Sequence, residues 1–219
     1  MPEIARGGMG IVYAAIDKLS GREVAIKIMK PGMCAAAFRR EARIAAKLNH
    51  PGIPPVHSMG SLTNGVPFLV MKLIRGETLD RLLGRRRNPG QDLGKNLSVF
   101  EQICQAVGYA HAQGIIHRDL KPKNIMVGAY GEVQVMDWGL ARDLKLTSQE
   151  DDGVVTGNES QAEDSQISVV GQIKGTPAYM APEQARGEPL DTRADIFAFG
   201  RNPSGDSDWE TTICRKHST

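Results

Sequence analysis

Apolar residues in the first third of the chain fall into short runs that are separated by turn residues. Residues 11–16 and 24–29 are two such runs, the second rich in β-branched side chains, and residues 17–21 between them have turn composition. Pro31-Gly32 ends this pattern, and residues 35–48 then have helical composition. Apolar side chains near one face of this predicted helix are Phe38, Ala42, Ala45 and Ala46. The pattern therefore predicts a pair of strands followed by a helix.

Beyond this helix the pattern predicts two more short strands and then changes to helix. The strands are expected around Val56 and over residues 66–73. A short apolar stripe at helical spacing follows and consists of Leu79, Leu82 and Leu83. Residues 84–96 are rich in Gly, Arg and Asn, which indicates a loop. A strand-rich first part thus gives way to a helical one.

The longest predicted helix covers residues 97–113 and is ended by Gly114. Its apolar stripe consists of Phe100, Ile103, Cys104, Val107 and Ala110. Short strands recur at residues 125–127 and 133–136. Residues 143–172 are polar, and a structureless stretch of that length in a compact domain indicates a functional loop. This order of elements predicts two subdomains with a cleft between them.

Composition places the chain among soluble globular proteins. Of its 219 residues 41% are hydrophobic, which fits one sizeable core or two small lobes. The net charge of +2 favours neither a nucleic acid nor a membrane surface, and the arginines at 85–87 are interpreted as a solvated loop. Three cysteines at distant positions predict no disulfide framework and no zinc site, so a reducing, cytoplasmic setting is expected. We expect no signal peptide and no membrane segment, since no apolar run approaches about 20 residues.

A glycine-rich string begins the candidate chemistry. Ala5-Arg6-Gly7-Gly8-Met9-Gly10-Ile11-Val12-Tyr13 would let the backbone approach a phosphate, although a hairpin turn has the same composition. Lys27 lies within the second predicted strand, in the string Val24-Ala25-Ile26-Lys27. Glu41 lies on the following predicted helix, where the two side chains could pair. Taken alone, each of these two residues would be interpreted as a solvated surface charge.

The string His117-Arg118-Asp119-Leu120-Lys121-Pro122-Lys123-Asn124 is far more specific. It puts a carboxylate, an ammonium group and an amide on one short loop. Phosphoryl transfer needs a carboxylate to orient the attacking hydroxyl, a cation to offset charge on the moving group, and an oxygen ligand for Mg²⁺. Asp137-Trp138-Gly139 offers a second hard oxygen ligand. The string Gly175-Thr176-Pro177-Ala178-Tyr179-Met180-Ala181-Pro182-Glu183 closes the polar segment.

Together these motifs resemble the eukaryotic-type (Hanks-type) protein kinase family, and their residues are most similar to those of its bacterial serine/threonine members. The resemblance covers residues 3–200. It implies an α+β, two-lobed protein kinase fold with a strand-rich N-lobe at residues 1–73 and a partial, helical C-lobe at residues 74–200. A long activation segment would span residues 137–183. Residues 201–219 depart from the family and are expected to be a disordered tail.

The resemblance also implies an activity and a set of roles. The ATP γ-phosphate would pass to a Ser or Thr hydroxyl of a protein substrate, with Asp119 as the catalytic base and Lys121 stabilising the moving phosphate. Lys27 would contact the α- and β-phosphates and be held by Glu41. Residues implied to bind ATP are Gly7, Gly8 and Gly10 at the phosphates, Val12, Ala25 and Met126 around adenine, and Met71 as gatekeeper. Residues implied to hold Mg²⁺ are Asn124 and Asp137.

Three further features complete what the resemblance implies. Thr176 would help to place the acceptor peptide, and the His-Arg-Asp-x-Lys form resembles serine/threonine rather than tyrosine kinases. Asp195 would brace the catalytic loop from the next helix. Arg118 is expected to pair with a phosphate on the polar segment, for which Ser165 and Ser168 are the favoured hydroxyls.

The sequence departs from the family at several positions. Ala5 replaces the first glycine of the glycine-rich loop, which is expected to weaken nucleotide binding. Trp138 replaces the phenylalanine of D-F-G, and Lys72 stands where a hinge acid is common. The strand before Ala5 is nearly absent. The family pattern stops at Gly200, early in the predicted helix that contains Asp195, so the chain alone is expected to have little kinase activity.

Three functions stay open on the residues alone. The first is an active protein serine/threonine kinase, the second a nucleotide-binding regulatory module without catalysis, and the third a small-molecule phosphotransferase. The intact set of Lys27, Asp119, Asn124 and Asp137 argues against the second. The peptide-positioning segment at 175–183 argues against the third.

Overall fold

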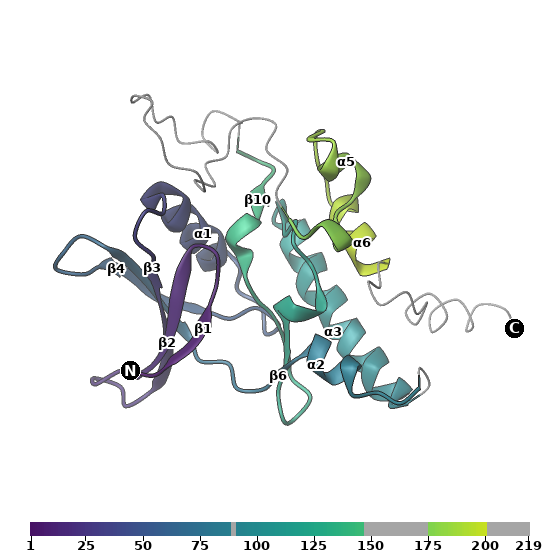
Figure 1. Ribbon diagram of the computed structural model, residues 1–219, viewed down its shortest axis with the longest axis horizontal. Helices are drawn as coiled ribbons and strands as arrows, with labels where there is room; N and C mark the ends of the chain where they lie inside the picture. Colours follow the sequence, from purple (N-terminus) through teal and green to yellow (C-terminus); the bar gives the residue numbers. More distant parts are fainter. Residues whose placement is uncertain (89–90, 147–174, 201–219) are drawn as a thin grey trace, which may run out of the picture.

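The computed structural model describes residues 1–88, 91–146 and 175–200. They form a strand-rich lobe on the left of Figure 1 and a mainly helical lobe on the right. The predicted two-lobed α+β architecture is thereby confirmed. Two stretches with predictions of their own, residues 147–174 of the polar segment and the tail at 201–219, lie outside the described residues.

The N-lobe is built on a five-stranded antiparallel sheet with strand order β1-β2-β3-β5-β4. Its strands are β1 (Glu3–Arg6), β2 (Gly10–Ile16), β3 (Glu23–Met29), β4 (Val56–Ser61) and β5 (Pro67–Lys72). The predicted turn between β2 and β3 forms: Gly21 adopts a φ of 69°, and its N–H donates to the Asp17 carbonyl at 2.8 Å. β1 is a four-residue strand with all side chains exposed, where the sequence indicated almost none.

A single helix, α1 (Ala35–Lys47), packs against this sheet and contacts β4 and β5. Its buried residues are Phe38, Glu41, Ala42 and Ile44. Phe38 and Ala42 form a small core with Leu69 of β5. Ala45 is only partly buried and Ala46 is exposed, so the apolar face predicted from the sequence is rotated toward Glu41. A charged side chain is therefore part of the buried face of α1.

The described part of the C-lobe combines α-helices with short strands and short 3-10 helices. Its elements are β6 (Glu77–Thr78), α2 (Leu79–Gly84), α3 (Leu93–Ala112), β7 (Ile115–Ile116), η1 (Pro122–Asn124), β8 (Ile125–Val127), β9 (Val133–Val135), η2 (Trp138–Leu140), β10 (Arg142–Asp143), η3 (Pro177–Tyr179), α5 (Pro182–Ala185) and α6 (Arg193–Gly200). The strands form two small antiparallel sheets, one of β6, β8 and β9 and one of β7 and β10.

Helix α3 is the main support of the C-lobe core. Its buried face consists of Val99, Ile103, Ala106, Val107 and Ala110. The helix begins at Leu93, earlier than predicted, so the loop expected at 84–96 is shorter. Cys104, which the sequence placed on the apolar stripe, is exposed. The stripe is centred on Ile103 and Val107 instead, one position away from Cys104.

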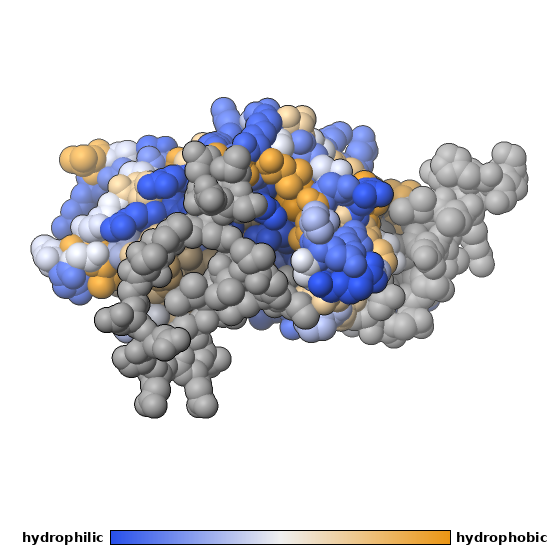
Figure 2. All heavy atoms as spheres, turned by 90° about the horizontal axis from the view of Figure 1, so that it is seen from above, coloured by the Kyte–Doolittle hydropathy of each residue, from blue (hydrophilic) through white to orange (hydrophobic). Residues whose placement is uncertain are grey.

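The two lobes share one hydrophobic core. Ile44 of α1, with Leu48 and Ile53 after it, belongs to the same cluster as Val135 and Trp138 of the C-lobe. Seen from above in Figure 2, hydrophilic residues cover most of the coloured surface, with smaller hydrophobic areas between them. Across the described ranges, no helix is both long enough and apolar enough to cross a bilayer.

Candidate active site

Four residues predicted for the nucleotide site lie on one face of the N-lobe sheet. Val12 of β2 is directly opposite Lys27 of β3, and Ala25 of β3 is directly opposite Met71 of β5. Because directly opposite residues point to the same face, and residues two apart in a strand do so too, all four side chains share that face. Met126 lies on β8 of the C-lobe, paired with Thr78 of β6.

The glycine-rich loop, residues 5–10, lies next to Lys27 on this face of the sheet. Gly10 pairs with Met29 across β2 and β3, and a Cβ at Gly10 would lie 2.8 Å from the Ile28 carbonyl oxygen and 3.0 Å from Cγ of Lys27. Glycine is therefore required there by close packing rather than by backbone conformation. Gly7 donates its N–H to the Gly10 carbonyl at 3.0 Å, and the Lys30 ammonium donates to the Gly7 carbonyl at 2.5 Å. Gly8 next to them is exposed.

The predicted pairing of Lys27 and Glu41 is present in the structure. The Lys27 ammonium donates to Oε1 of Glu41, and both side chains are at least nine-tenths buried. Burial alone would lower the pKa of Lys27, but the carboxylates of Glu41 and Asp137 outweigh it and hold that pKa above its ordinary value. Burial raises the pKa of Glu41, with Lys27 opposing that shift and Asp137 adding to it. Two carboxylates thus surround a single ammonium group.

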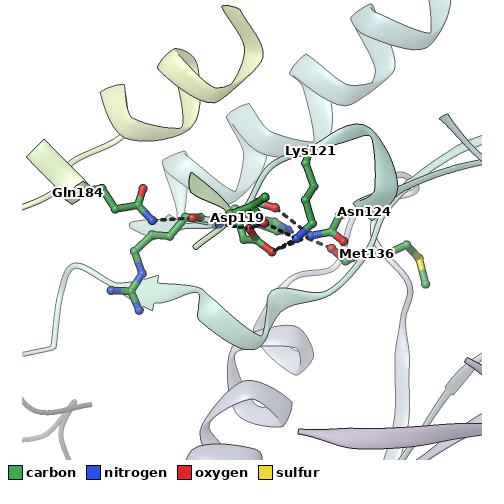
Figure 3. Close-up of polar contacts among 8 residues, drawn as sticks. Asp119, Lys121, Asn124, Met136 and Gln184 are labelled. Atoms are coloured by element: carbon green, nitrogen blue, oxygen red, sulfur yellow. Dashed lines mark hydrogen bonds and ion pairs between the residues drawn. The ribbon is translucent and has the colours of Figure 1, made fainter. Parts of the chain in front are cut away.

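Side chains of the catalytic loop, residues 117–124, converge on the carboxylate of Asp119 (Figure 3). Lys121 donates to Oδ2 at 2.7 Å, and the Asn124 amide donates to Oδ2 at 3.2 Å and to the Asp119 carbonyl at 2.8 Å. Thr176 arrives from the far end of the polar segment and donates its N–H and its hydroxyl to Oδ1, at 3.0 and 2.7 Å. Lys121 also donates to the Thr176 hydroxyl at 2.6 Å. The structure therefore brings together Asp119, Lys121, Asn124 and Thr176.

Asp195 of α6 accepts hydrogen bonds from the backbone of the catalytic loop. Its Oδ1 accepts the Arg118 N–H at 2.8 Å, and its Oδ2 accepts the His117 N–H at 2.8 Å and lies 2.8 Å from Nε2 of His111. Arg118 adopts a φ of 68°, which is disfavoured for a non-glycine residue. Gln184 of α5 contacts the next peptide group by donating to the Arg118 carbonyl at 2.8 Å. Hydrogen bonds on both sides thus stabilise the strained backbone before Asp119.

Trp138 anchors the segment that contains Asp137. Its indole Nε1–H donates to the Val135 carbonyl at 3.0 Å, its side chain is buried, and its ring lies 4.7 Å from the His117 ring. His117 in turn has Nε2 at 3.0 Å from the Met136 carbonyl and accepts the Asp119 N–H on Nδ1 at 3.2 Å. These two contacts require the proton on Nε2 of His117. Asp137 itself adopts a φ of 59°.

The donor set around Asn124 and Asp137 fits a divalent cation. Asn124 uses its amide nitrogen on Asp119, which leaves the amide oxygen as a ligand. Oε2 of Glu41 is a buried carboxylate oxygen with no hydrogen-bond partner. A Cβ at Gly139 would lie 3.2 Å from Asp137 Oδ1 and 3.3 Å from that Glu41 oxygen. Within the described part of the chain, no cluster of three His, Cys, Asp or Glu side chains forms a metal site alone.

Two residues of this site were not predicted from the sequence. His111 was included only in the long helix, and Gln184 directly follows the closing string. Both act through contacts to residues far away in the chain, Asp195 and Arg118. The adjacency of Gln184 to Glu183 was the only sequence signal. The Glu183 side chain is itself partly buried.

The architecture and this site define the class of protein. The family described as protein kinase domain matches residues 1–201, so the chain belongs to the protein kinase family. The chain is 36% identical over 213 residues to the serine/threonine-protein kinase PknD of Protochlamydia amoebophila, covering 90% of this chain and 21% of that relative. It is 39% identical over 216 residues to PknD of Chlamydia trachomatis serovar D and 40% identical over 215 residues to PknD of Chlamydia muridarum, covering 90% of this chain and 23% of each. The chain thus spans about a fifth to a quarter of the length of these curated relatives.

Proposed function

We propose that the chain transfers the γ-phosphoryl group of ATP to serine or threonine hydroxyls of protein substrates. One observation carries the proposal. The Asp119 carboxylate accepts a hydrogen bond from a threonine hydroxyl, that of Thr176, at 2.7 Å, and Lys121 contacts both groups. An acceptor hydroxyl in place of Thr176 would have its proton within reach of a base and its oxygen beside a cation.

Each catalytic side chain has a task that its position supports. Asp119 orients the acceptor hydroxyl and takes its proton. Lys121 offsets negative charge on the moving phosphoryl group, where an oriented cation in a partly buried site is most effective. Lys27, held by Glu41, aligns the α- and β-phosphates so that reacting groups meet in line. Catalysis by this set consists of positioning and charge compensation rather than covalent chemistry.

ATP and Mg²⁺ are the proposed cofactors. Gly7, Gly8 and Gly10 would lie over the phosphates, and Val12, Ala25, Met71 and Met126 would enclose adenine. Asn124 and Asp137 would hold the metal. When bound, Mg²⁺ neutralises charge on the β- and γ-phosphates. The two carboxylates around Lys27 support this assignment, because they leave the site short of positive charge. The free thiols of Cys34 and Cys104 support a reducing, cytoplasmic setting.

Replacement of the base is the direct test. In a chain that carries a complete kinase domain, Asp119→Asn is expected to lower phosphate transfer to dephosphorylated casein by at least about 10²-fold while Mg-ATP binding persists, because the base acts on the acceptor hydroxyl. Transfer is measured with labelled ATP and binding by calorimetry. Asp17→Asn in the exposed turn between β2 and β3 is the matched control and should transfer normally.

Full turnover by Asp119→Asn would show that the assigned role is wrong. Binding of ATP without transfer to casein by the unaltered chain would favour a catalytically inactive fragment or the regulatory module. Transfer to a panel of small metabolites, with none to protein, would favour the small-molecule phosphotransferase.

A further inference from the structure

Helix α1 contacts the active site and the segment after Asp137 at the same time. Glu41 points to Lys27 of β3. Its neighbour Arg40 donates to the Ala141 carbonyl at 3.3 Å, and Lys47 at the end of the helix forms an ion pair with Asp143. Arg40 and Lys47 are seven residues, or two turns, apart and so share a face of the helix. Figure 1 shows α1 and β10 side by side.

The ion pair between Lys47 and Asp143 is unequal in its exposure to water. Nζ of Lys47 lies 2.8 Å from Oδ2 of Asp143, and the lysine side chain is 54% exposed while that of the aspartate is 5% exposed. Loss of Asp143 would return Lys47 to water at little cost. Loss of Lys47 would leave a buried carboxylate without its cation, which is the more damaging change. The pair therefore differs from an ordinary surface salt bridge, in which both partners are solvated.

Asp143 is in turn fixed to the C-lobe by the backbone around it. It pairs with Ile115 in the sheet of β7 and β10, and the following N–H, from Leu144, donates to the Gly114 carbonyl at 2.7 Å. Its other carboxylate oxygen accepts the Lys145 N–H at 3.0 Å. Lys47 thus ties the C-terminal end of α1 to a backbone that belongs to the C-lobe.

We propose that Lys47 is a positioning residue that, through Asp143, holds α1 in the orientation in which Glu41 reaches Lys27. A cation at the C-terminal end of a helix also suits the helix dipole. The ion pair couples the N-lobe helix to the first residues of the segment that leads from Asp137 toward the hydroxyls of residues 147–174. The effect on catalysis rests on the proposed kinase function, whereas the effect on α1 does not.

The test compares four single variants and one double variant of the 219-residue chain by two measurements. Lys47→Met removes the cation, Lys47→Arg preserves it, and Asp143→Asn removes the buried charge. Arg43→Met is the matched control, because Arg43 is an exposed cation on the same helix. Hydrogen exchange of the α1 amides reports the helix directly, and kcat and KM for ATP with dephosphorylated casein report alignment of the site.

Lys47→Met is expected to speed exchange in the last turns of α1 and to lower kcat/KM for ATP by about five- to tenfold, at the low end of couplings between sites. Lys47→Arg should restore most of both, and Asp143→Asn should have the smaller effect. Adding Asp143→Asn to Lys47→Met should cause no further loss. If Lys47→Met matches Arg43→Met in both measurements, the positioning role is wrong. If neither the unaltered chain nor any variant transfers phosphate, the exchange comparison alone decides the role of Lys47.

Discussion

A buried carboxylate sets the geometry of the catalytic loop at the scale of single residues. Asp195 is 1% exposed and accepts two backbone N–H groups, those of His117 and Arg118. Burial would raise the pKa of Asp195, but His111, His117 and the two N–H groups outweigh it and hold that pKa below its ordinary value of 3.8. The ionised form is therefore the form that the folded protein stabilises.

This shift predicts a pH dependence of stability. A carboxylate with a depressed folded-state pKa contributes stability above its unfolded-state pKa and loses it as pH falls through the folded-state value. At neutral pH, Asp195→Asn should lower the free energy of unfolding by about 2–4 kcal/mol, since two buried N–H groups lose a charged acceptor. The difference from the unaltered chain should shrink below about pH 4.

Urea unfolding across this pH range, followed by circular dichroism, measures the difference. The exposed Glu101 of α3 provides the control Glu101→Gln, for which no such pH-dependent difference is expected. A difference for Asp195→Asn that stays constant from neutral to acid pH would contradict the assignment.

At the scale of elements, the contact between α1 and η2 determines how Asp137 is presented. Ile44 of α1 and Trp138 of η2 belong to one core cluster, and the two elements touch. The family usually has a larger residue than Ala45 on the helix and Phe in place of Trp138, so a small Ala45 would leave room for the indole. Ala45 is partly buried. We therefore expect Ala45 and Trp138 to be in contact and to compensate for each other.

Ala45→Leu is therefore expected to overpack this contact, destabilising the chain by about 1–3 kcal/mol or displacing α1 and separating Glu41 from Lys27. Adding Trp138→Phe should recover much of that loss. A double-mutant cycle in thermal unfolding and in ATP affinity measures the coupling. Strictly additive effects would show that the two sites do not touch.

Elements with strong local patterns were predictable, and their exact faces were not. The β-branched run at 24–29 predicted β3 to within a residue. The face of α1 was predicted from its alanines, but burial of Glu41 is decided by Lys27, a partner on another element. Alanine is small enough to be buried or exposed, so its position on a helix carries little information. The earlier start of α3 at Leu93 was missed because the Gly, Arg and Asn content of residues 84–96 indicated a loop.

At the scale of the whole molecule, the polar segment connects the end of the site that contains Asp137 to the end that contains Thr176. It leaves the described residues after Leu146 and returns at Gly175, one residue before Thr176 contacts Asp119. Arg118 lies between these two ends, where its side chain donates to the Leu140 carbonyl at 2.5 Å. A phosphate on the segment would place a strong acceptor beside this guanidinium.

We therefore expect phosphate on residues 147–174 after incubation with Mg-ATP, first at Ser165 or Ser168. The other hydroxyls there are Thr147, Ser148, Thr156 and Ser160. Mass spectrometry of the chain, with Asp119→Asn as the control for contaminating kinases, identifies the sites. Absence of phosphate from the whole segment in an active preparation would mean that the segment is an insertion without this regulatory role.

The members of the site were predictable to the extent that they stand in contiguous strings. Asp119, Lys121 and Asn124 are close in sequence, so their convergence follows from one short loop. His111 and Asp195 are 84 residues apart, and their contact depends on how α3 and α6 pack. No local pattern encodes such a pairing, because it is a property of the assembled core.

Trp138 also makes the active site visible by optical means. The chain has two tryptophans, and Trp138 is the one buried beside Asp137, with its indole N–H bonded and its ring against His117. An indole in a dry, rigid setting emits at shorter wavelength than one in water, and a neighbouring imidazole quenches it when protonated. With Trp209 replaced by phenylalanine, the intrinsic fluorescence of the chain would come from this position alone. The residue that departs from the family's D-F-G is thus a built-in spectroscopic probe of the segment that carries Asp137.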